Sequence, residues 1–429
     1  MAVTLFTVFL VGLAVGIPVA LTMGMAGMAA LLVGGQFPPL VVAQQLFNGI
    51  NSFPLMAVPF FILAAELMTA CGLTNSLLRF ANDLVGHIRG GLGHVNVLVS
   101  MLFAGISGSA LADAAGPSAV VMRMMRKAGY RAEYAGALSA ATATIGPIIP
   151  PSILMVIYAV SDNRVTVAGL FMAGVLPGIM LGVALASANH VISIRRGYVF
   201  RSERPTLRTL GHSFLEAVPA LLMPLIILGG ILGGVFTPTE AGATAVAYAM
   251  LIGLFVTRSL KLRDLARTFV RAGVITASVL LIVSMASIFA WLLTILQIPQ
   301  TLASSIAALT DSALAVLILL AVFTLLCGLV IDTLPALIIL VPVLGPVAMQ
   351  FGIDPLHFAM MLVLNLTIGM VTPPVGPVLF VISTVGRIRL EILAKAIIPL
   401  LLAELAVLAF VILVPALSTT VPNLLGYTS

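Results

Sequence analysis

Long apolar runs, separated by short polar stretches, follow one another along the whole chain. A helix that spans a membrane needs about 20 mainly apolar residues, and most of the runs are long enough. The pattern therefore predicts an all-α polytopic membrane protein. In order, the runs cover residues 3–34, 53–71, 94–122, 134–160, 165–192, 214–233, 239–257, 272–297, 311–348, 357–385 and 396–416.

Four of these runs are interrupted near the middle. The runs at 94–122 and 311–348 contain polar and small residues there, and those at 134–160 and 357–385 contain Pro-Pro. Because proline removes a helical hydrogen bond, the last two are expected to be broken helices. Non-helical backbone at membrane depth survives only where protein or a water-filled cavity covers it. The interruptions therefore predict an internal site.

Composition narrows the class of protein. Of the 429 residues, 61% are hydrophobic and 8% are charged, whereas soluble proteins average about 25% charged residues. This excludes a cytosolic enzyme and a disordered scaffold, and no nucleic-acid partner is expected. Cys71 and Cys327 lie far apart in apolar runs, so neither a disulfide framework nor a Cys-rich metal site is expected. The first residues lack a basic region and are expected to form a membrane segment rather than a cleaved signal.

The basic residues predict the orientation. Nineteen of the 20 Lys and Arg residues form five clusters, and only Arg164 lies outside them. If the clusters are cytoplasmic, segment 94–122 must enter and leave the membrane on the cytoplasmic side. No Lys or Arg is then expected at membrane depth. Segment 311–348 has no basic residue near either end, so it is expected to enter from the periplasm. Both segments are therefore predicted to be re-entrant hairpins. The clusters are Arg79 and Arg89; Arg123, Arg126, Lys127 and Arg131; Arg195, Arg196, Arg201, Arg204 and Arg208; Arg258, Lys261, Arg263, Arg267 and Arg271; and Arg387, Arg389 and Lys395.

The same reasoning places both termini in the periplasm. Residues 3–34 must then cross twice, with a turn near Gly16-Ile17-Pro18. Two amphipathic pieces, 37–52 and 258–271, are interpreted either as arms lying in the membrane interface or as ordinary connections. The second piece has the better helical periodicity.

The chain contains an internal repeat. Thr144-Ile-Gly-Pro-Ile-Ile-Pro-Pro-Ser152 resembles Thr367-Ile-Gly-Met-Val-Thr-Pro-Pro-Val375, 223 residues further on. The first repeat is predicted at 1–194, with hairpin 94–122 and broken helix 134–160, and a cytoplasmic linker at 195–213. The second is predicted at 214–429, with hairpin 311–348 and broken helix 357–385. Five crossings in each half make the second half inverted, which is typical of secondary transporters with sites near the bilayer midplane.

Asp113 and Asp332 are expected near the two hairpin tips, each beside hydroxyls and glycines. Hard cations favour oxygen ligands of this kind, so one cation site per half is predicted where each tip meets its broken helix. The alternative is that both carboxylates only cap short helices. Sodium is favoured over a proton because a proton relay usually needs a chain of Asp, Glu or His, and the five histidines are expected in loops or near segment ends. Glu66 and Glu404 are expected to face other helices or the headgroup edge, and Glu240 to cap a helix.

Several motifs together resemble the large membrane subunit of the tripartite ATP-independent periplasmic (TRAP) transporters, the DctM type. The resemblance covers nearly the whole chain. The motifs are Phe47-Asn-Gly-Ile-Asn-Ser-Phe-Pro-Leu55, Gly105-Ile-Ser-Gly-Ser-Ala-Leu-Ala-Asp-Ala-Ala-Gly116, Ala143-Thr-Ile-Gly-Pro-Ile-Ile-Pro-Pro-Ser152, Phe236-Thr-Pro-Thr-Glu-Ala241 and Gly369-Met-Val-Thr-Pro-Pro-Val-Gly376.

The resemblance implies sodium-driven import of organic acids, often C4-dicarboxylates or sialic acid, across the bacterial inner membrane. It implies two partners: a DctP-type periplasmic binding protein and a DctQ-type small membrane subunit with four helices. It also implies the elevator architecture of the ion-transporter superfamily, in which hairpins and broken helices slide against a fixed scaffold.

Candidate site residues come from the tips, the breaks and this resemblance, and at least two sodium ions are expected. The candidate sodium ligands are Ser107, Gly108, Ser109, Asp113, Thr144, Gly146, Gly328, Asp332, Thr333, Thr367, Gly369 and Thr372. The candidate substrate contacts are Ser109, Ala110, Pro150, Pro151, Ser152, Pro373 and Pro374.

Three other functions compete with this interpretation. The nearest is a hairpin-type carboxylate or anion carrier that works without a binding protein. Gly105-Ile-Ser-Gly108 matches the G-x-S-G of rhomboid-type intramembrane proteases, but that chemistry needs a His base beside the Ser. Asp113 and Asp332 could form an aspartyl protease dyad, although opposed tips suit two separate ion sites better.

Overall fold

The computed structural model describes residues 1–35, 37–38, 40–198 and 204–427, and these are helical almost throughout. Six helices are long and apolar enough to cross a membrane by length and composition, or up to seven if a bent pair counts as one span. The bent pair is Leu40–Ile50 with Pro54–Ala70, at 60°. The predicted all-α, multi-pass class is therefore confirmed.

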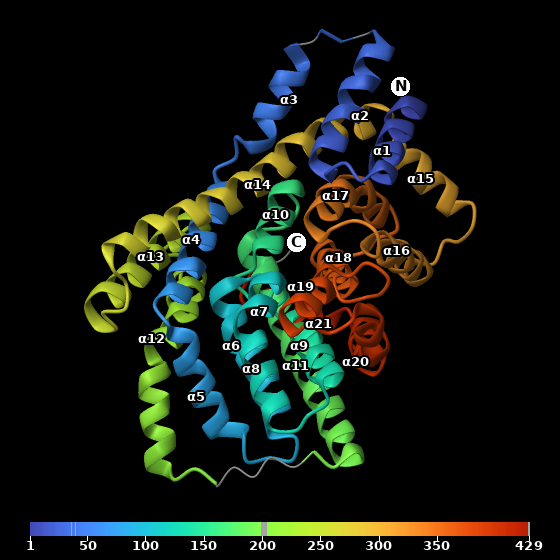
Figure 1. Cartoon of the computed structure of the whole chain (residues 1–429). Coiled ribbons are helices and arrows are strands. Elements are labelled where there is room, and N and C mark those ends of the chain that lie inside the picture. The colour runs from blue at the N-terminus through green and yellow to red at the C-terminus, as the bar shows by residue number, and fades with distance from the viewer. Residues whose placement is uncertain (36, 39, 199–203, 428–429) are drawn as a thin grey trace.

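One set of helices, which we call the frame, comes from the beginning of each half (Figure 1). Within it α14 packs against α2, α3 and α4, and α12 packs against α5 and α13. The frame consists of α1 (Ala2–Val15), α2 (Val19–Gly34), α3 (Leu40–Ile50), the 3₁₀ turn η1 (Pro54–Met56), α4 (Ala57–Ala70), α5 (Leu73–Val85), α12 (Leu207–Leu232), α13 (Pro238–Leu251), the π turn η2 (Ile252–Val256), α14 (Leu262–Ile295) and α15 (Ile298–Ala307).

The remaining helices form the core bundle. Its centre is α9 and α18, whose residues are buried along almost their whole length. The bundle consists of α6 (Gly91–Ser107), α7 (Ala110–Ala115), α8 (Pro117–Lys127), α9 (Ala132–Ala143), α10 (Ile153–Ser161), α11 (Val167–Arg196), α16 (Ala313–Gly328), α17 (Thr333–Gln350), α18 (Pro355–Gly369), α19 (Pro377–Gly386), α20 (Leu390–Leu413) and α21 (Ala416–Leu424).

The helix order of the core bundle repeats along the chain. Helices α9 and α18 begin at Ala132 and Pro355, and α11 and α20 begin at Val167 and Leu390. Both pairs of starting residues are separated by the 223 residues that relate the two T-I-G-x-x-x-P-P segments. The same elements therefore recur in the same order in both halves.

The interrupted runs fold as two hairpins and two broken helices. In the first hairpin α6 packs against α8, with the short α7 between them, and in the second α16 packs against α17. Both Pro-Pro runs are broken as expected, between α9 and α10 and between α18 and α19. Each Pro-Pro bond is cis.

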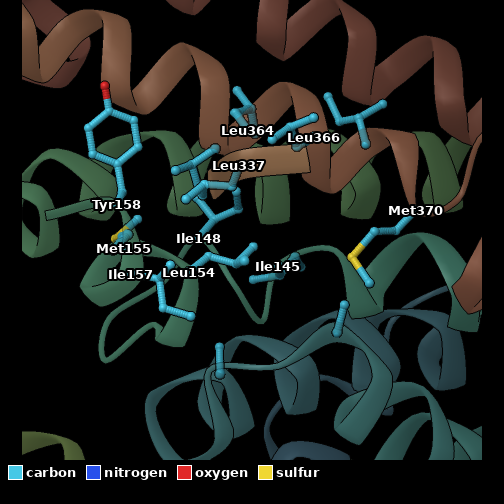
Figure 2. Close-up of a cluster of buried hydrophobic side chains, with 14 of the residues drawn as sticks. Ile145, Ile148, Leu154, Met155, Ile157, Tyr158, Leu337, Leu364, Leu366 and Met370 are labelled. Atoms are coloured by element: carbon cyan, nitrogen blue, oxygen red, sulfur yellow. The ribbon is translucent and has the colours of Figure 1, made fainter. Parts of the chain in front are cut away.

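Buried side chains join the two halves in one core. Figure 2 shows Ile148 of the first break and Leu154 and Tyr158 of α10 beside Leu337 of α17 and Leu364 of α18. All five are at most 5% exposed. The broken helix of the first half is therefore packed against the hairpin and the broken helix of the second half.

The N-terminal run divides as expected. Helices α1 and α2 pack against each other, and the chain turns at Gly16, which has a φ of 83°. The predicted cap at Glu240 is also confirmed, because Thr237 and Glu240 form a reciprocal capping box at the start of α13.

The structure corrects several boundaries. Segment 258–271 is not a separate arm, because α14 runs unbroken from Leu262 to Ile295. Within 37–52, Leu40–Ile50 is a helix packed on α14 rather than an ordinary connection, although residue 39 lies outside the described residues. The linker is shorter than 195–213 because α11 extends to Arg196 and α12 starts at Leu207. His212 therefore lies within α12 and not in a loop.

Among the described residues, three helices were not predicted at all: α5, α15 and α21. Each is short, with 13, 10 and 9 residues, and each contains several polar residues. Such segments lack the long apolar run that predicts a membrane-spanning helix.

Candidate functional site

The tip of the first hairpin lies directly against the first helix break. A Cβ atom built on Gly108 would lie 2.4 Å from the carbonyl oxygen of Pro151, and one on Gly146 would lie 3.1 Å from the carbonyl of Ser109. Gly108 also has a φ of 58°, which side chains rarely adopt. The backbone can approach this closely only because both positions are glycine.

The second tip meets the second break in the same way. A Cβ on Gly369 would lie 3.0 Å from the carbonyl oxygen of Gly328. The Thr333 hydroxyl, 3% exposed, donates a hydrogen bond of 3.4 Å to the carbonyl of Leu366. The structure thus brings each tip to its own break, as the sequence predicted.

Both tips also line one shared cavity of about 350 Å³. Gly108, Ser109 and Ala110 come from the first tip, and Asp332 and Thr333 from the second. The frame helices α4 and α14 supply the other wall, including Glu66, Arg271 and Ile275. A cavity of this size can hold a small organic molecule.

Asp113 lies behind the first tip, outside the lining of this cavity. Its side chain is fully buried, and its Oδ1 accepts a hydrogen bond of 3.2 Å from the Ser118 hydroxyl. The Ser100 hydroxyl lies 3.3 Å from that of Ser118. Oδ2 has no hydrogen-bond partner among the described residues. A buried carboxylate with a free oxygen could accept a cation there.

Asp332 has a different environment. It is half-buried and is the N-cap of α17, where Oδ1 accepts a 2.9 Å hydrogen bond from the backbone N–H of Thr333. Asp332 therefore caps a helix, as the alternative interpretation in the sequence analysis expected. Its position on the cavity wall leaves a second role open.

The two threonines of the second break form hydrogen bonds to their own helix. Thr367 and Thr372 donate to the carbonyls of Val363 and Ile368 at 2.7 and 2.8 Å. Because the hydroxyl proton is used in this way, the oxygen lone pairs remain free to face a cation.

Ser107 is 3% exposed, and its Oγ accepts a long hydrogen bond of 3.4 Å from the backbone N–H of Ser109. The Ser152 hydroxyl donates to the carbonyl of Pro147 and caps α10. Of the predicted substrate contacts, only Ser109 and Ala110 line the cavity. Pro150, Pro151, Ser152, Pro373 and Pro374 are not among its lining residues.

Two acidic residues of the apolar runs have partners that the sequence did not indicate. Glu404 of α20 is fully buried and accepts a 2.9 Å hydrogen bond from Thr144, 260 residues away. Glu66 of α4 forms an ion pair of 3.3 Å with Nε of Arg271. Both face other helices, as expected.

The sequence did not predict that Arg271 lines the cavity together with both tips. The sequence placed Arg271 at the end of a surface arm. Since α14 continues through this position without a break, the arm is the first part of a long helix. The absence of proline between residues 262 and 295 is the signal that could have shown this.

The whole chain is similar to proteins of one transporter family. The family model of the DctM component of the tripartite ATP-independent periplasmic transporter matches residues 6–417. The sialic acid TRAP transporter large permease protein SiaM of Vibrio cholerae is 41% identical over 416 residues, which cover 96% of each protein. The isethionate TRAP transporter permease protein DctMQ of Oleidesulfovibrio alaskensis is 40% identical over 413 residues, which cover 96% of this chain and 65% of that relative.

The chain therefore belongs to the DctM family of TRAP transporter large permeases. It is a multi-pass membrane permease and not an enzyme, which removes both protease hypotheses. Relatives in the family are named for carboxylates, among them sialic acid and C4-dicarboxylates. The solved structure of the YdaH transporter of Alcanivorax borkumensis is similar in fold, with a TM-score of 0.61 over 86% of each chain at 17% identity.

Proposed function

We propose that this permease imports an organic acid, such as a C4-dicarboxylate, sialic acid or a related carboxylate, driven by a sodium gradient. The observation that supports this most strongly is the single cavity shared by both hairpin tips. The first residues of α10 and α17, Ile153 and Thr333, also line it. Helix N-termini favour anions, so the cavity has suitable groups for a carboxylate.

We propose one sodium site at each tip. The first comprises Ser107, Gly108, Ser109, Asp113, Thr144 and Gly146, and the second comprises Gly328, Asp332, Thr333, Thr367, Gly369 and Thr372. The donors available are hydroxyl, carbonyl and carboxylate oxygens, which suit a hard cation. The free Oδ2 of buried Asp113 supports the first site, since an uncompensated buried charge is costly.

The proposed movement is an elevator. The core bundle, with its hairpins re-entrant from opposite sides of the membrane, would slide against the frame and carry the cavity across the bilayer. Support comes from the recurrence of helix order in the two halves. Five crossings in each half would invert the second repeat relative to the first, with both termini in the periplasm.

Two further subunits complete the proposed system. A DctQ-type small membrane subunit is supported by the relative named DctMQ, of which this chain covers 65%. A DctP-type binding protein would deliver the substrate in the periplasm, and this chain would then lie in the bacterial inner membrane. The alternative is a carrier that works without a binding protein.

Proteoliposomes with both membrane subunits test this function. A thermal-shift screen of the binding protein against N-acetylneuraminate, succinate and isethionate selects the probe. We expect uptake that needs an inward sodium gradient and the binding protein. Equal uptake with choline in place of sodium would overturn sodium coupling. Full uptake without the binding protein would favour the alternative carrier.

A further inference from the structure

The cavity between the tips contains an ion pair that the proposed sodium sites do not use. Arg271 of α14 and Glu66 of α4 both line it, with Arg271 Nε 3.3 Å from Glu66 Oε2. Both belong to the frame, whereas the tips belong to the core bundle. The pair therefore faces the hairpins from across the cavity.

Arg271 has unused hydrogen-bonding capacity. A guanidinium group carries five N–H donors in a planar fork, and Glu66 contacts it through Nε. Neither Nη1 nor Nη2 has a hydrogen-bond partner among the described residues, and 71% of the side chain is exposed. The shortest contact of Glu66, at 20% exposure, is with Nε, so the Nη1 and Nη2 donors are available to a ligand.

The charges of the cavity wall make Arg271 distinctive. It is the one basic residue among the described lining residues, and Glu66 and Asp332 are the two acidic ones. A carboxylate entering the cavity would meet two negative side chains and one positive side chain. Arg271 is therefore the side chain that can attract it, and its fork matches a carboxylate in two parallel hydrogen bonds.

We propose that Arg271 binds a carboxylate of the transported acid from the frame side of the cavity, and that Glu66 positions the guanidinium for this contact. The inference rests on the proposed function. Because Arg271 lies on the frame, the contact exists when the tips are level with it. The residue would thus bind the substrate in one part of the transport cycle.

The test is equilibrium binding to the complex of the large and small subunits in nanodiscs. The probe is whichever of radiolabelled N-acetylneuraminate or succinate shows the stronger sodium-dependent binding to the wild type. We expect Arg271→Gln to weaken binding at least tenfold at saturating sodium. The half-saturating sodium concentration should remain unchanged, because Arg271 is not a sodium ligand.

Three variants distinguish substrate binding by Arg271 from a purely structural ion pair between α14 and α4. Arg267→Gln, one turn earlier on α14 and outside the cavity lining, is the matched control and should bind like the wild type. Arg271→Lys keeps the charge without the fork, so we expect an intermediate affinity, and it replaces Arg271→Gln if that variant does not fold. Glu66→Gln removes the ion pair but leaves Arg271 and the size of its neighbour unchanged, so we expect it to lose less than threefold.

The outcomes distinguish a wrong role for Arg271 from a wrong proposed function. Unchanged binding by Arg271→Gln, or by Arg271→Lys where it replaces that variant, would overturn the assignment of Arg271 and leave the proposed function intact. Equal losses in Glu66→Gln and Arg271→Gln would also overturn it, because they would indicate a structural ion pair. If no probe shows sodium-dependent binding to the wild type, the proposed function itself fails and this inference fails with it.

Discussion

Replacing Gly108 with Ala tests the contact between the first hairpin tip and the first break. Two separate costs apply. A side chain at a φ of 58° costs about 1–2 kcal/mol. The new Cβ would also lie 2.4 Å from the Pro151 carbonyl oxygen, and overpacking of this kind typically costs about 1–3 kcal/mol. Together we expect a destabilisation of about 2–5 kcal/mol.

Gly129 provides a matched control for this variant. Its φ is 86°, and a Cβ there would meet nothing within 4 Å, so Gly129→Ala should cost only the backbone part, about 1–2 kcal/mol. Thermal denaturation of both variants in nanodiscs measures the difference, and sodium-driven uptake measures its consequence. Gly108→Ala should melt at the lower temperature and lose most of its uptake. Equal melting temperatures for the two variants would refute the close approach at the tip.

Two other contacts give predictions of stability. Glu404→Gln should melt near the wild-type temperature, because an amide oxygen can still accept a hydrogen bond from Thr144. Glu404→Ala leaves a cavity at a fully buried position and should lower the free energy of unfolding by about 2–5 kcal/mol. Equal melting temperatures of the two variants would contradict this. Thr237→Ala removes the capping box of α13 and should cost about 1 kcal/mol. Thr244→Ala should cost less, because the Thr244 hydroxyl donates to the Glu240 carbonyl of the same helix and does not cap it. Thermal denaturation ranks all four variants.

The hairpin tips and helix breaks could be predicted because their cause is local. Glycine, proline and polar residues interrupt apolar runs at 105–113 and 144–152, and such interruptions prevent a continuous helix wherever the segment packs. The internal repeat, with its offset of 223 residues, predicted the second hairpin tip and the second helix break. The meeting of Gly108 with Pro151 and of Gly328 with Gly369 followed from pairing each tip with its own break.

Contacts between distant helices could not be predicted in this way. Thr144 and Glu404 are 260 residues apart, and no local pattern indicates which helix receives a buried carboxylate. The contact between Arg271 and Glu66 was not predicted either, because Glu66 comes from α4 and lies far from Arg271 in the sequence. The sharing of one cavity by both tips likewise depends on how α10, α17 and α18 pack together.

Sodium-stimulated uptake by Asp113→Ala and Asp332→Ala tests the proposed ion sites most directly. The variants are reconstituted with the small subunit and the binding protein, and initial rates are measured across a range of sodium concentrations. We predict that each variant loses sodium stimulation or needs at least tenfold more sodium, with correctly folded protein in both cases. Wild-type sodium stimulation in both variants would contradict the assignment of the coupling ions to the hairpin tips.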